Sequence, residues 1–280
     1  MWSSAGSCVS GTLLKTSDVV FSADDFGLTE SVNEAVEQAH LDGVLTQASL
    51  MVAGPAASDA VVRAQRLPGL RVGLHLVLVE GDSVLGHHAL PQITGTDGRF
   101  GRDQASLGVR YFFSSAARRE LAAEIRAQYA AFRATGLPLH HVDAHKHMHL
   151  HPTVAALLID IGREFGLTRV RVPREPPRVL AACGHRPGWG DHALYAWSRV
   201  LRGQVRRAGL DCDEQVFGIA WSGQMTEARV RRLLAHMPPG RSEIYFHPAI
   251  ESDSALQSLM PDYRHREEFE ALLGLKFPIS

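Results

Sequence analysis

Short apolar runs rich in β-branched residues alternate along the chain with segments whose apolar residues recur every three or four positions. The first run, at residues 18–22, is followed by a turn at 23–27 and then by apolar residues at positions 32, 35, 36 and 39. A continuous apolar run bounded by turn residues is typical of a buried strand, and the second spacing is typical of an amphipathic helix.

This alternation predicts a parallel α/β fold, because strands that alternate with helices pair in parallel through right-handed crossovers. The predicted strands are 18–22, 46–52, 71–77, a run through Val142, 168–172, 215–220 and 242–246. The predicted helices are 31–43, 55–66, 115–135, 152–165, 191–207, 226–236 and 262–273.

Seven such units fit either a closed or nearly closed barrel or a doubly wound sheet. Polar residues lie at the ends of four predicted strands: Asp24 and Asp25, His75, His145, and His247. A barrel brings the carboxyl ends of all its strands to one rim, whereas a doubly wound sheet places its site at a single switch point. We therefore predict a single-domain (β/α) barrel of about seven parallel strands, TIM-barrel-like, over residues 17–280, with its site at the C-terminal rim. Residues 1–16 are assigned to an N-terminal extension.

The composition is that of an ordinary globular protein, with 45% hydrophobic and 21% charged residues. The net charge of −1 gives no indication of nucleic-acid binding. Three widely spaced cysteines fit a reducing compartment, and no apolar run reaches the roughly twenty residues of a membrane span. Because the first sixteen residues also lack a signal-peptide pattern, we expect a cytoplasmic protein.

Two stretches stand apart from this pattern. Residues 79–113 are long for a connection and contain Phe100, Tyr111, Phe112 and Phe113. Long loops are commonly functional, so we predict a wall or lid over bound substrate. Between residues 169 and 207, nine arginines accompany only two acidic residues. That basic stretch is either a solvated face or a contact with an anionic membrane surface.

Six of the fifteen histidines lie between residues 140 and 151, in the sequence HHVDAHKHMHLH. In an extended segment alternate side chains share a face, so Asp143, His145, His147 and His149 would project together. Imidazoles beside a carboxylate bind divalent cations. The alternative is a solvated histidine-rich loop. The segment is internal and precedes an apolar helical pattern, so a metal site is favoured.

The remaining polar positions indicate what such a metal would do. Asp24 and Asp25 offer one carboxylate for a cation and another for a base, although such a pair can also cap a helix. His75 and His247 adjoin apolar runs, where histidine is as often a hydrogen-bonded core residue. An Asp-His-His set leaves positions open for water and substrate, as catalytic sites do. With a base, and a histidine of unperturbed pKa about 6.5 as acid, it predicts metal-assisted hydrolysis of an amide or ester.

Two other functions stay open at this point. A metal phosphoesterase would commonly use two or more metal ions, whereas only one carboxylate and two histidines are well placed here. A non-catalytic metal-binding or carbohydrate-binding protein would need neither a free base nor an acid.

Four segments resemble the signature segments of the YdjC-like carbohydrate deacetylases. They are FSADDFG at 21–27, VGLHL at 72–76, VDAHKHMH at 142–149 and EIYFHP at 243–248. Three further segments resemble the hopanoid-biosynthesis branch called HpnK: RYFFSS at 110–115, HKHMHLHPT at 145–153 and RVPREPP at 171–177.

The resemblance implies a metal-dependent hydrolase that removes acetyl groups from N-acetylated amino sugars. It places Asp25, His75 and His145 as ligands of one divalent ion, Mg²⁺ or Zn²⁺, although His147 or His149 could replace His145. It places Asp24 as general base and His247 as general acid. His147, His149, Asp143 and Arg174 are assigned to substrate binding.

The branch resemblance implies an N-acetylglucosaminyl hopanoid lipid as substrate; the alternative is a soluble N-acetyl-oligosaccharide such as chitobiose. A lipid-linked substrate is compatible with peripheral contact at the inner membrane face. The resemblance is also compatible with a homodimer.

Overall fold

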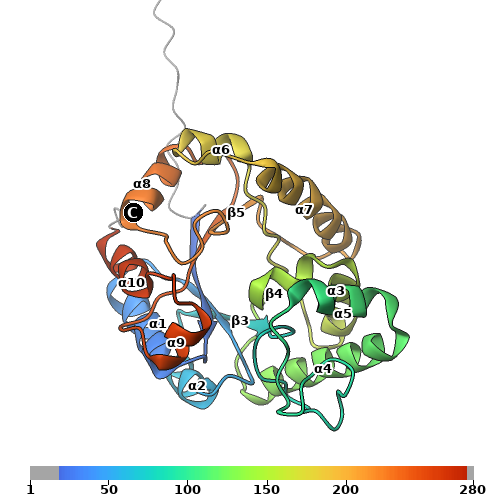
Figure 1. Ribbon diagram of the computed structural model, residues 1–280. Coiled ribbons are helices and arrows are strands. Elements are labelled where there is room, and N and C mark those ends of the chain that lie inside the picture. Colours follow the sequence, from blue (N-terminus) through green and yellow to red (C-terminus); the bar gives the residue numbers. More distant parts are fainter. Residues whose placement is uncertain (1–18, 276–280) are drawn as a thin grey trace, which may run out of the picture.

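The computed structural model describes residues 19–275, in which six parallel strands form one sheet with the order β4-β3-β2-β1-β6-β5. The strands are β1 (Val19–Phe26), β2 (Gln47–Leu50), β3 (Arg71–Leu76), β4 (Val142–Ala144), β5 (Gln215–Phe217) and β6 (Ser242–Phe246). The sheet curls into a half-barrel, and the helices are arranged around it (Figure 1). The prediction of a parallel α/β architecture is therefore confirmed.

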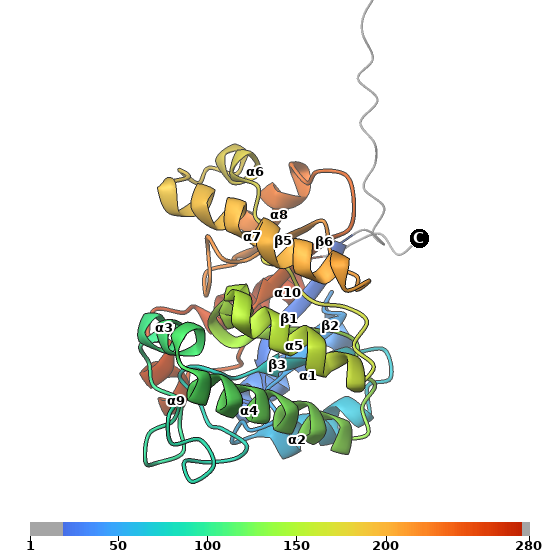
Figure 2. The same cartoon turned by 90° about the vertical axis from the view of Figure 1, so that its right-hand side faces the viewer.

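Helical segments surround this sheet (Figure 1). They are α1 (Glu30–Asp42), α2 (Ala57–Gln65), α3 (Gln104–Phe113), α4 (Ser115–Ala134), the short 3-10 segment η2 (His145–Leu150), α5 (Pro152–Glu164), α6 (Pro177–Ala182), α7 (Trp189–Arg207), α8 (Glu227–Ala235), α9 (Ser254–Leu259) and α10 (His265–Gly274). Helices α4, α5 and α7 pack in sequence along one side (Figure 2). No helix within residues 19–275 is long and apolar enough to cross a bilayer.

The prediction of a closed barrel with seven strands is wrong. Residues 168–172, the predicted fifth strand, form only isolated bridges, in which Val142 pairs with Val170 and Arg169 with Asp211. The neighbouring strand β4 is three residues long because the chain turns into η2 at His145. A ladder needs a longer partner than β4. This segment is therefore joined by single backbone hydrogen bonds to Val142 of β4 and to Asp211, which precedes β5.

Three short helices, α3, α6 and α9, were not predicted. The residues of α3 were predicted to be part of the long loop at 79–113. In the structure Asp103 caps the first turn of this helix, and Leu107 and Tyr111 are buried. The buried hydroxyl of Tyr111 donates to the Leu78 carbonyl at 2.8 Å. Phe112 and Phe113 stay exposed on the same helix, which obscures its amphipathic pattern.

The interior of the half-barrel is polar at its centre. His141 lies inside it, 1% exposed, against Gln47 and Ser49. A Cβ on Gly73 would lie 2.3 Å from the His141 ring, so β3 needs glycine at this position. Buried polar groups are normally hydrogen-bonded, as these three are. Ser49 also donates to Asp143, so this polar layer of His141, Gln47 and Ser49 adjoins the site described next.

Candidate active site

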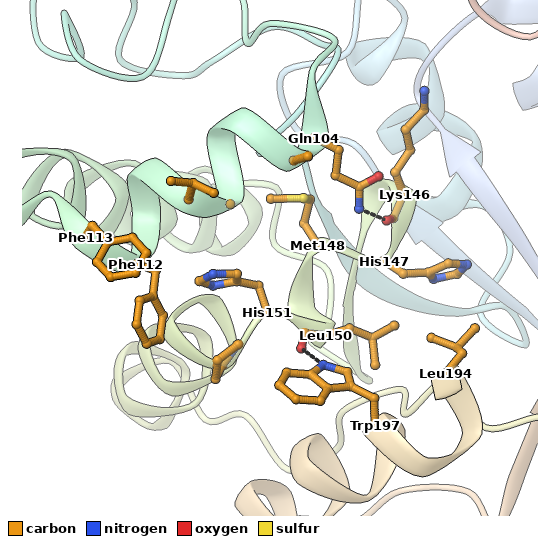
Figure 3. A pocket seen from close by; sticks show the side chains of 14 residues that line it. Gln104, Phe112, Phe113, Lys146, His147, Met148, Leu150, His151, Leu194 and Trp197 are labelled. Carbon is orange, nitrogen blue, oxygen red and sulfur yellow. Dashed lines mark hydrogen bonds between the residues drawn. The ribbon is translucent and has the colours of Figure 1, made fainter. Parts of the chain in front are cut away.

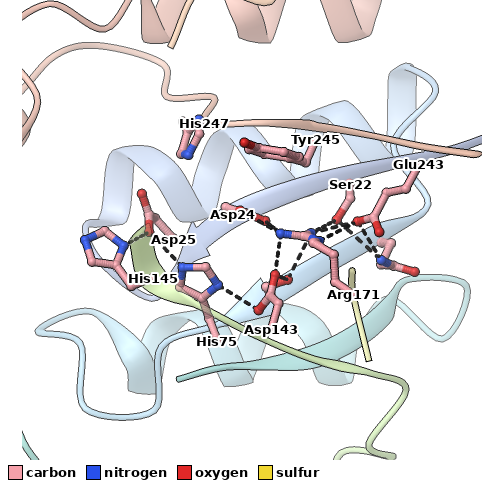
Figure 4. Close-up of polar contacts among 12 residues, drawn as sticks. Ser22, Asp24, Asp25, His75, Asp143, His145, Arg171, Glu243, Tyr245 and His247 are labelled. Atoms are coloured by element: carbon pink, nitrogen blue, oxygen red, sulfur yellow. Dashed lines mark hydrogen bonds and ion pairs between the residues drawn. The ribbon is translucent and has the colours of Figure 1, made fainter. Parts of the chain in front are cut away.

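An irregularity at the end of β1 separates the two neighbouring aspartates. The register between β1 and β2 shifts between Ala23 and Phe26, and Asp25 has a left-handed φ of 61°. Such a conformation is uncommon for a residue other than glycine and is often found at functional sites. As a result, Asp24 faces the interior toward Arg171, whereas Asp25 faces two histidines (Figure 4).

Asp25, His75 and His145 form a buried triad at the carboxyl ends of the strands. Asp25 Oδ1 lies 3.3 Å from His75 Nε2 and 3.0 Å from His145 Nδ1. Three potential ligand atoms, one from each residue, all lie within 4.8 Å of one another. Asp25 Oδ2 is buried without a hydrogen-bond partner among the described residues. This arrangement can bind a metal ion, and the prediction that the three residues lie together is confirmed.

The charge state of the triad also fits a cation. Burial alone raises the pKa of Asp25, but His145 and His75 outweigh it and hold the pKa well below its usual range. Burial lowers the pKa of His75, but Asp143 and Asp25 raise it to about 10. A metal ion would take the place of the proton on the His75 nitrogen that faces Asp25, because a histidine ligand binds through an unprotonated nitrogen.

Asp143 orients His75 from the other side. Its Oδ1 lies 2.8 Å from His75 Nδ1, and its Oδ2 accepts a hydrogen bond from Ser49 at 3.0 Å. A carboxylate behind a ligating imidazole selects the tautomer whose other nitrogen faces the metal. Asp143 is fully buried, which favours this supporting role over direct contact with a sugar.

Arg171 organises the second aspartate. Its Nη1 donates to both Asp24 carboxylate oxygens at 2.7 Å and forms an ion pair with Asp143. Its Nη2 lies 2.7 Å from Glu243 Oε1. Burial raises the pKa of Asp24 to about 6 although Arg171 opposes the shift. Asp24 is therefore a carboxylate at neutral pH and a stronger base than an exposed one.

The sequence interpretation gave Arg171 and Glu243 no role in the site. It placed Arg171 in the basic stretch of 169–207 as a solvated or membrane-facing residue, which is wrong because Arg171 is 1% exposed. The signal was present, because Arg171 lies between Val170 and Val172, and Glu243 precedes Ile244 in a strand. A charged residue inside an apolar strand is almost never buried unless it is paired. What the sequence did not indicate is which residues pair with it.

The histidine segment is not extended, so the prediction that its alternate side chains share one face is wrong. The backbone enters η2 at His145, and Lys146 and His147 are left-handed, with φ of 50° and 55°. His147 Nε2 lies 2.9 Å from the Tyr245 hydroxyl, and His149 Nε2 lies 3.1 Å from the Arg171 carbonyl. Burial lowers the pKa of both histidines, His149 to about 4, so both are neutral at pH 7.

Arg174 is not joined to the triad by any contact among the described residues. Its guanidinium donates to the Glu214 carbonyl at 2.9 Å and to the Tyr195 hydroxyl at 2.6 Å. It also lies over the Tyr195 ring of α7. Its assignment to substrate binding stays a prediction.

His247 follows β6 and lies near the triad (Figure 4). The centroid of its ring lies 4.9 Å from that of the Tyr263 ring. Burial lowers its pKa to about 3; Asp25 opposes the shift, and His265, His145 and His75 add to it. The expected pKa near 6.5 therefore does not apply to the free protein, in which His247 is neutral. Its Nδ1 is buried without a hydrogen-bond partner among the described residues and lies 3.9 Å from Glu268.

The fold and this site define an α/β half-barrel protein with a buried carboxylate–histidine site at the carboxyl ends of its strands. Residues 18–278 match the family model for the YdjC-like protein, and the chain belongs to this family.

Similar proteins include a carbohydrate deacetylase of Brevibacillus brevis, 38% identical over 159 residues, which are 57% of this chain and 59% of that protein. A carbohydrate deacetylase of Vibrio cholerae is 37% identical over 147 residues, 52% of this chain and 56% of that protein. The chain thus matches less than two thirds of the length of these curated relatives.

Among solved structures, the fold is similar to that of an Enterococcus faecalis protein named for cellobiose-phosphate cleavage. The TM-score is 0.69 at 20% identity, over 91% of this chain and 90% of that one. At this identity the likeness concerns the fold alone.

Proposed function

We propose that the protein is a metal-dependent N-deacetylase that hydrolyses the acetamide of an N-acetylated amino sugar. The observation that carries the proposal is the triad of Asp25, His75 and His145, whose ligand atoms lie within 4.8 Å. A base and an imidazole lie beside it, in Asp24 and His247 (Figure 4). The deacetylase names of the relatives that match about half of the chain support the same activity.

The donor set fits one divalent ion. Two imidazoles and a carboxylate suit Zn²⁺, and Mg²⁺ is the alternative in which water would complete the coordination. Asp25 Oδ2, buried and unpaired, is a free donor atom for such an ion. When bound, the ion would polarise the acyl oxygen and lower the pKa of a water molecule.

The chain supplies the proton transfers. Asp24, held by Arg171, can accept a proton from the attacking water, because its pKa of about 6 lies near neutral pH. The neutral His247 ring can hydrogen-bond the substrate through Nε2, because its Nδ1 is buried on the side of Glu268. To act as an acid toward the leaving amine, His247 must first receive a proton. Because burial lowers its pKa to about 3, this requires that the charges around His247 change when substrate binds.

Purified protein reconstituted with Zn²⁺ or Mg²⁺ and incubated with N-acetylglucosaminides tests this proposal. We expect one equivalent of acetate per free amine, loss of one acetyl mass, and no turnover after chelation. A matched pair, His145→Ala and His149→Ala, identifies the third ligand by metal content. Hydrolysis of a phosphate ester without acetate release would instead support a phosphoesterase, and metal binding without either activity a binding protein.

For the acceptor carried by the sugar, we propose an apolar lipid such as a hopanoid. Helices α3 and α7 and the η2 segment line a groove of about 650 Å³ that includes His147 (Figure 3). Its walls are mainly apolar, with Phe112 on one side and Trp197 on the other. The Trp197 indole is fixed by a hydrogen bond to the Leu150 carbonyl at 2.9 Å.

The groove can be tested with two substrates that share one sugar. Phe112→Ser should weaken action on a lipid-linked N-acetylglucosaminide and spare a small soluble one, since only the former fills the groove. The exposed Val62→Ser on α2 serves as control. Equal effects of Phe112→Ser on both substrates would point to a structural role and to a soluble oligosaccharide.

We further propose that Phe113, which lines this groove, and Trp189, at the start of α7, contact the inner face of a membrane. Trp189 is 93% exposed and Phe113 is 75% exposed, and α7 carries several arginines. Exposed aromatic residues beside arginines favour the interface of an anionic bilayer. Co-sedimentation with anionic but not neutral vesicles would support this contact, and its loss in Trp189→Ser would assign it. The cytoplasmic location and the homodimer stay predictions.

A further inference from the structure

A second, smaller cavity adjoins the triad. It has a volume of about 130 Å³ and is lined by His145 together with apolar side chains: Leu28, Met51, Val77, Leu259 and Met260. Small-molecule sites commonly measure about 300–1,000 Å³, so this cavity can hold only a fragment of a ligand.

The cavity adjoins the triad through one shared residue and several neighbouring ones. His145 belongs to both the triad and the cavity wall. Val77 follows the ligand-bearing strand β3 two residues after His75, and the Leu28 amide donates to the Asp25 carbonyl at 2.9 Å. The larger groove is lined by the next residues, Lys146 and His147. The two spaces thus adjoin consecutive residues of one turn.

We infer that this cavity receives the acyl group of the scissile amide and admits N-acyl groups longer than acetyl, up to about butyryl. The inference rests on the proposed N-deacetylase function and extends it to short-chain N-acyl amino sugars. In the reaction, water adds its oxygen to the acyl carbon and the C–N bond breaks. The amine takes up a proton and leaves, and the carboxylate remains in the cavity.

The volume supports more than a methyl group. A cavity of about 150 Å³ lined by apolar side chains binds a molecule the size of benzene. A cavity of about 130 Å³ therefore leaves room beyond an acetyl methyl. Each further methylene that becomes buried favours binding about fourfold, until the cavity is full.

Part of the wall is fixed and part can adapt. Gln128 pairs with both backbone groups of Val77, at 3.0 Å to its nitrogen and 2.8 Å to its oxygen. A Cβ on Gly81 would lie 2.6 Å from a Val77 methyl, so the Val77 side chain keeps its place only because residue 81 is glycine. Met51 and Met260 are flexible and can rearrange around chains of different length.

The mouth of the cavity is polar, which limits the length of the chain. Asp82 and Arg99 form an ion pair at 2.7 Å, and both residues line the cavity. Glu80, also in the lining, is paired with Lys146 and lies 3.4 Å from Arg102. An acyl chain that passed the apolar walls would have to desolvate these charges. The value of kcat/KM should therefore fall sharply for acyl groups longer than about four carbons.

The test compares kcat/KM for glucosamine carrying N-acetyl, N-propionyl, N-butyryl and N-hexanoyl groups, measured as free amine. For the wild type we expect the propionyl and butyryl values within about tenfold of acetyl, and hexanoyl at least about a hundredfold lower. Leu259→Phe, at the partly exposed end of α9, should lower the butyryl-to-acetyl ratio at least about tenfold. Met260→Ala should raise the hexanoyl value.

Val62→Phe, an exposed position on α2, is the size-matched control and should leave all ratios unchanged. Val77→Phe gives a second filling variant, so that misfolding of one variant does not decide the result. Cleavage of N-acetyl alone by the wild type, or ratios unchanged in both filling variants, would overturn the inference and leave the deacetylase function standing. No cleavage of any of the N-acyl sugars would refute the proposed function and this inference with it.

Discussion

Replacing Arg171 by methionine should destabilise the protein strongly and in a pH-dependent way. The side chain is 1% exposed and pairs with three buried carboxylates, Asp24, Asp143 and Glu243. Methionine keeps an unbranched chain but removes the charge and every donor. Removing one partner of a buried ion pair costs about 3–5 kcal/mol, because the remaining charge stays buried and uncompensated.

The loss of stability can be measured as a decrease in melting temperature, Tm. A change of 1 kcal/mol shifts Tm by about 2–4 °C in proteins of roughly this size, so we expect a decrease of about 6–20 °C at pH 8. Arg126→Met is the matched control. Arg126 and Glu164 pair on the surface, 49% and 54% exposed, where such pairs contribute about 0–1 kcal/mol.

The pH dependence identifies the cause. Burial raises the pKa of Asp24 from 3.8 to about 6 and that of Glu243 from 4.5 to about 7. Folded protein thus binds more protons than unfolded protein between about pH 4 and 7, and the stability from these groups falls as pH rises. Without Arg171 both pKa values rise further. The deficit of Arg171→Met relative to wild type should therefore be larger at pH 8 than at pH 5.5.

Differential scanning fluorimetry at both pH values, with urea unfolding as a second measure, provides the assay. A decrease below about 3 °C at pH 8, or one equal to that of Arg126→Met, would refute the buried network as described. A deficit that does not shrink at pH 5.5 would show that lost packing, rather than unpaired carboxylates, causes the change.

The remaining predictions concern the metal and the proton transfers. His75→Ala should lower bound metal from about one ion per chain to below about 0.1 in mass-spectrometric metal analysis, whereas His87→Ala, away from the triad, should not; full occupancy in His75→Ala would remove it from the site. Chelation should lower the Tm of the metal-loaded protein. The free energy of unfolding should fall by up to about 4 kcal/mol where the metal exceeds its Kd a thousandfold. Asp24→Asn and His247→Ala should keep their metal and lose about 10²- to 10⁴-fold in kcat. On an ester analogue, whose leaving group needs less protonation, His247→Ala should lose less; near-wild-type amide turnover would contradict these roles.

The sequence by itself determined the alternation of strands and helices and the positions of the candidate chemistry. Strand and helix patterns are set by neighbouring residues, so β1, β3 and β6 could be predicted from their apolar runs. Asp25 and His75 could be assigned to one rim because all parallel strands run in the same direction. The signature segments could be matched to a family because each is continuous in the chain.

The tertiary structure decided what depends on contacts between distant residues. Arg171 and Asp24 are separated by 147 positions, and only the fold brings the guanidinium onto that carboxylate. The left-handed backbone at Lys146 and His147 and the short β4 prevented the extended histidine face and the seventh strand of a closed barrel. Burial in the folded protein lowers the pKa of His247 from its ordinary value to about 3. Local sequence carries periodicity and residue type, whereas desolvation and charge pairing arise only when the chain is packed.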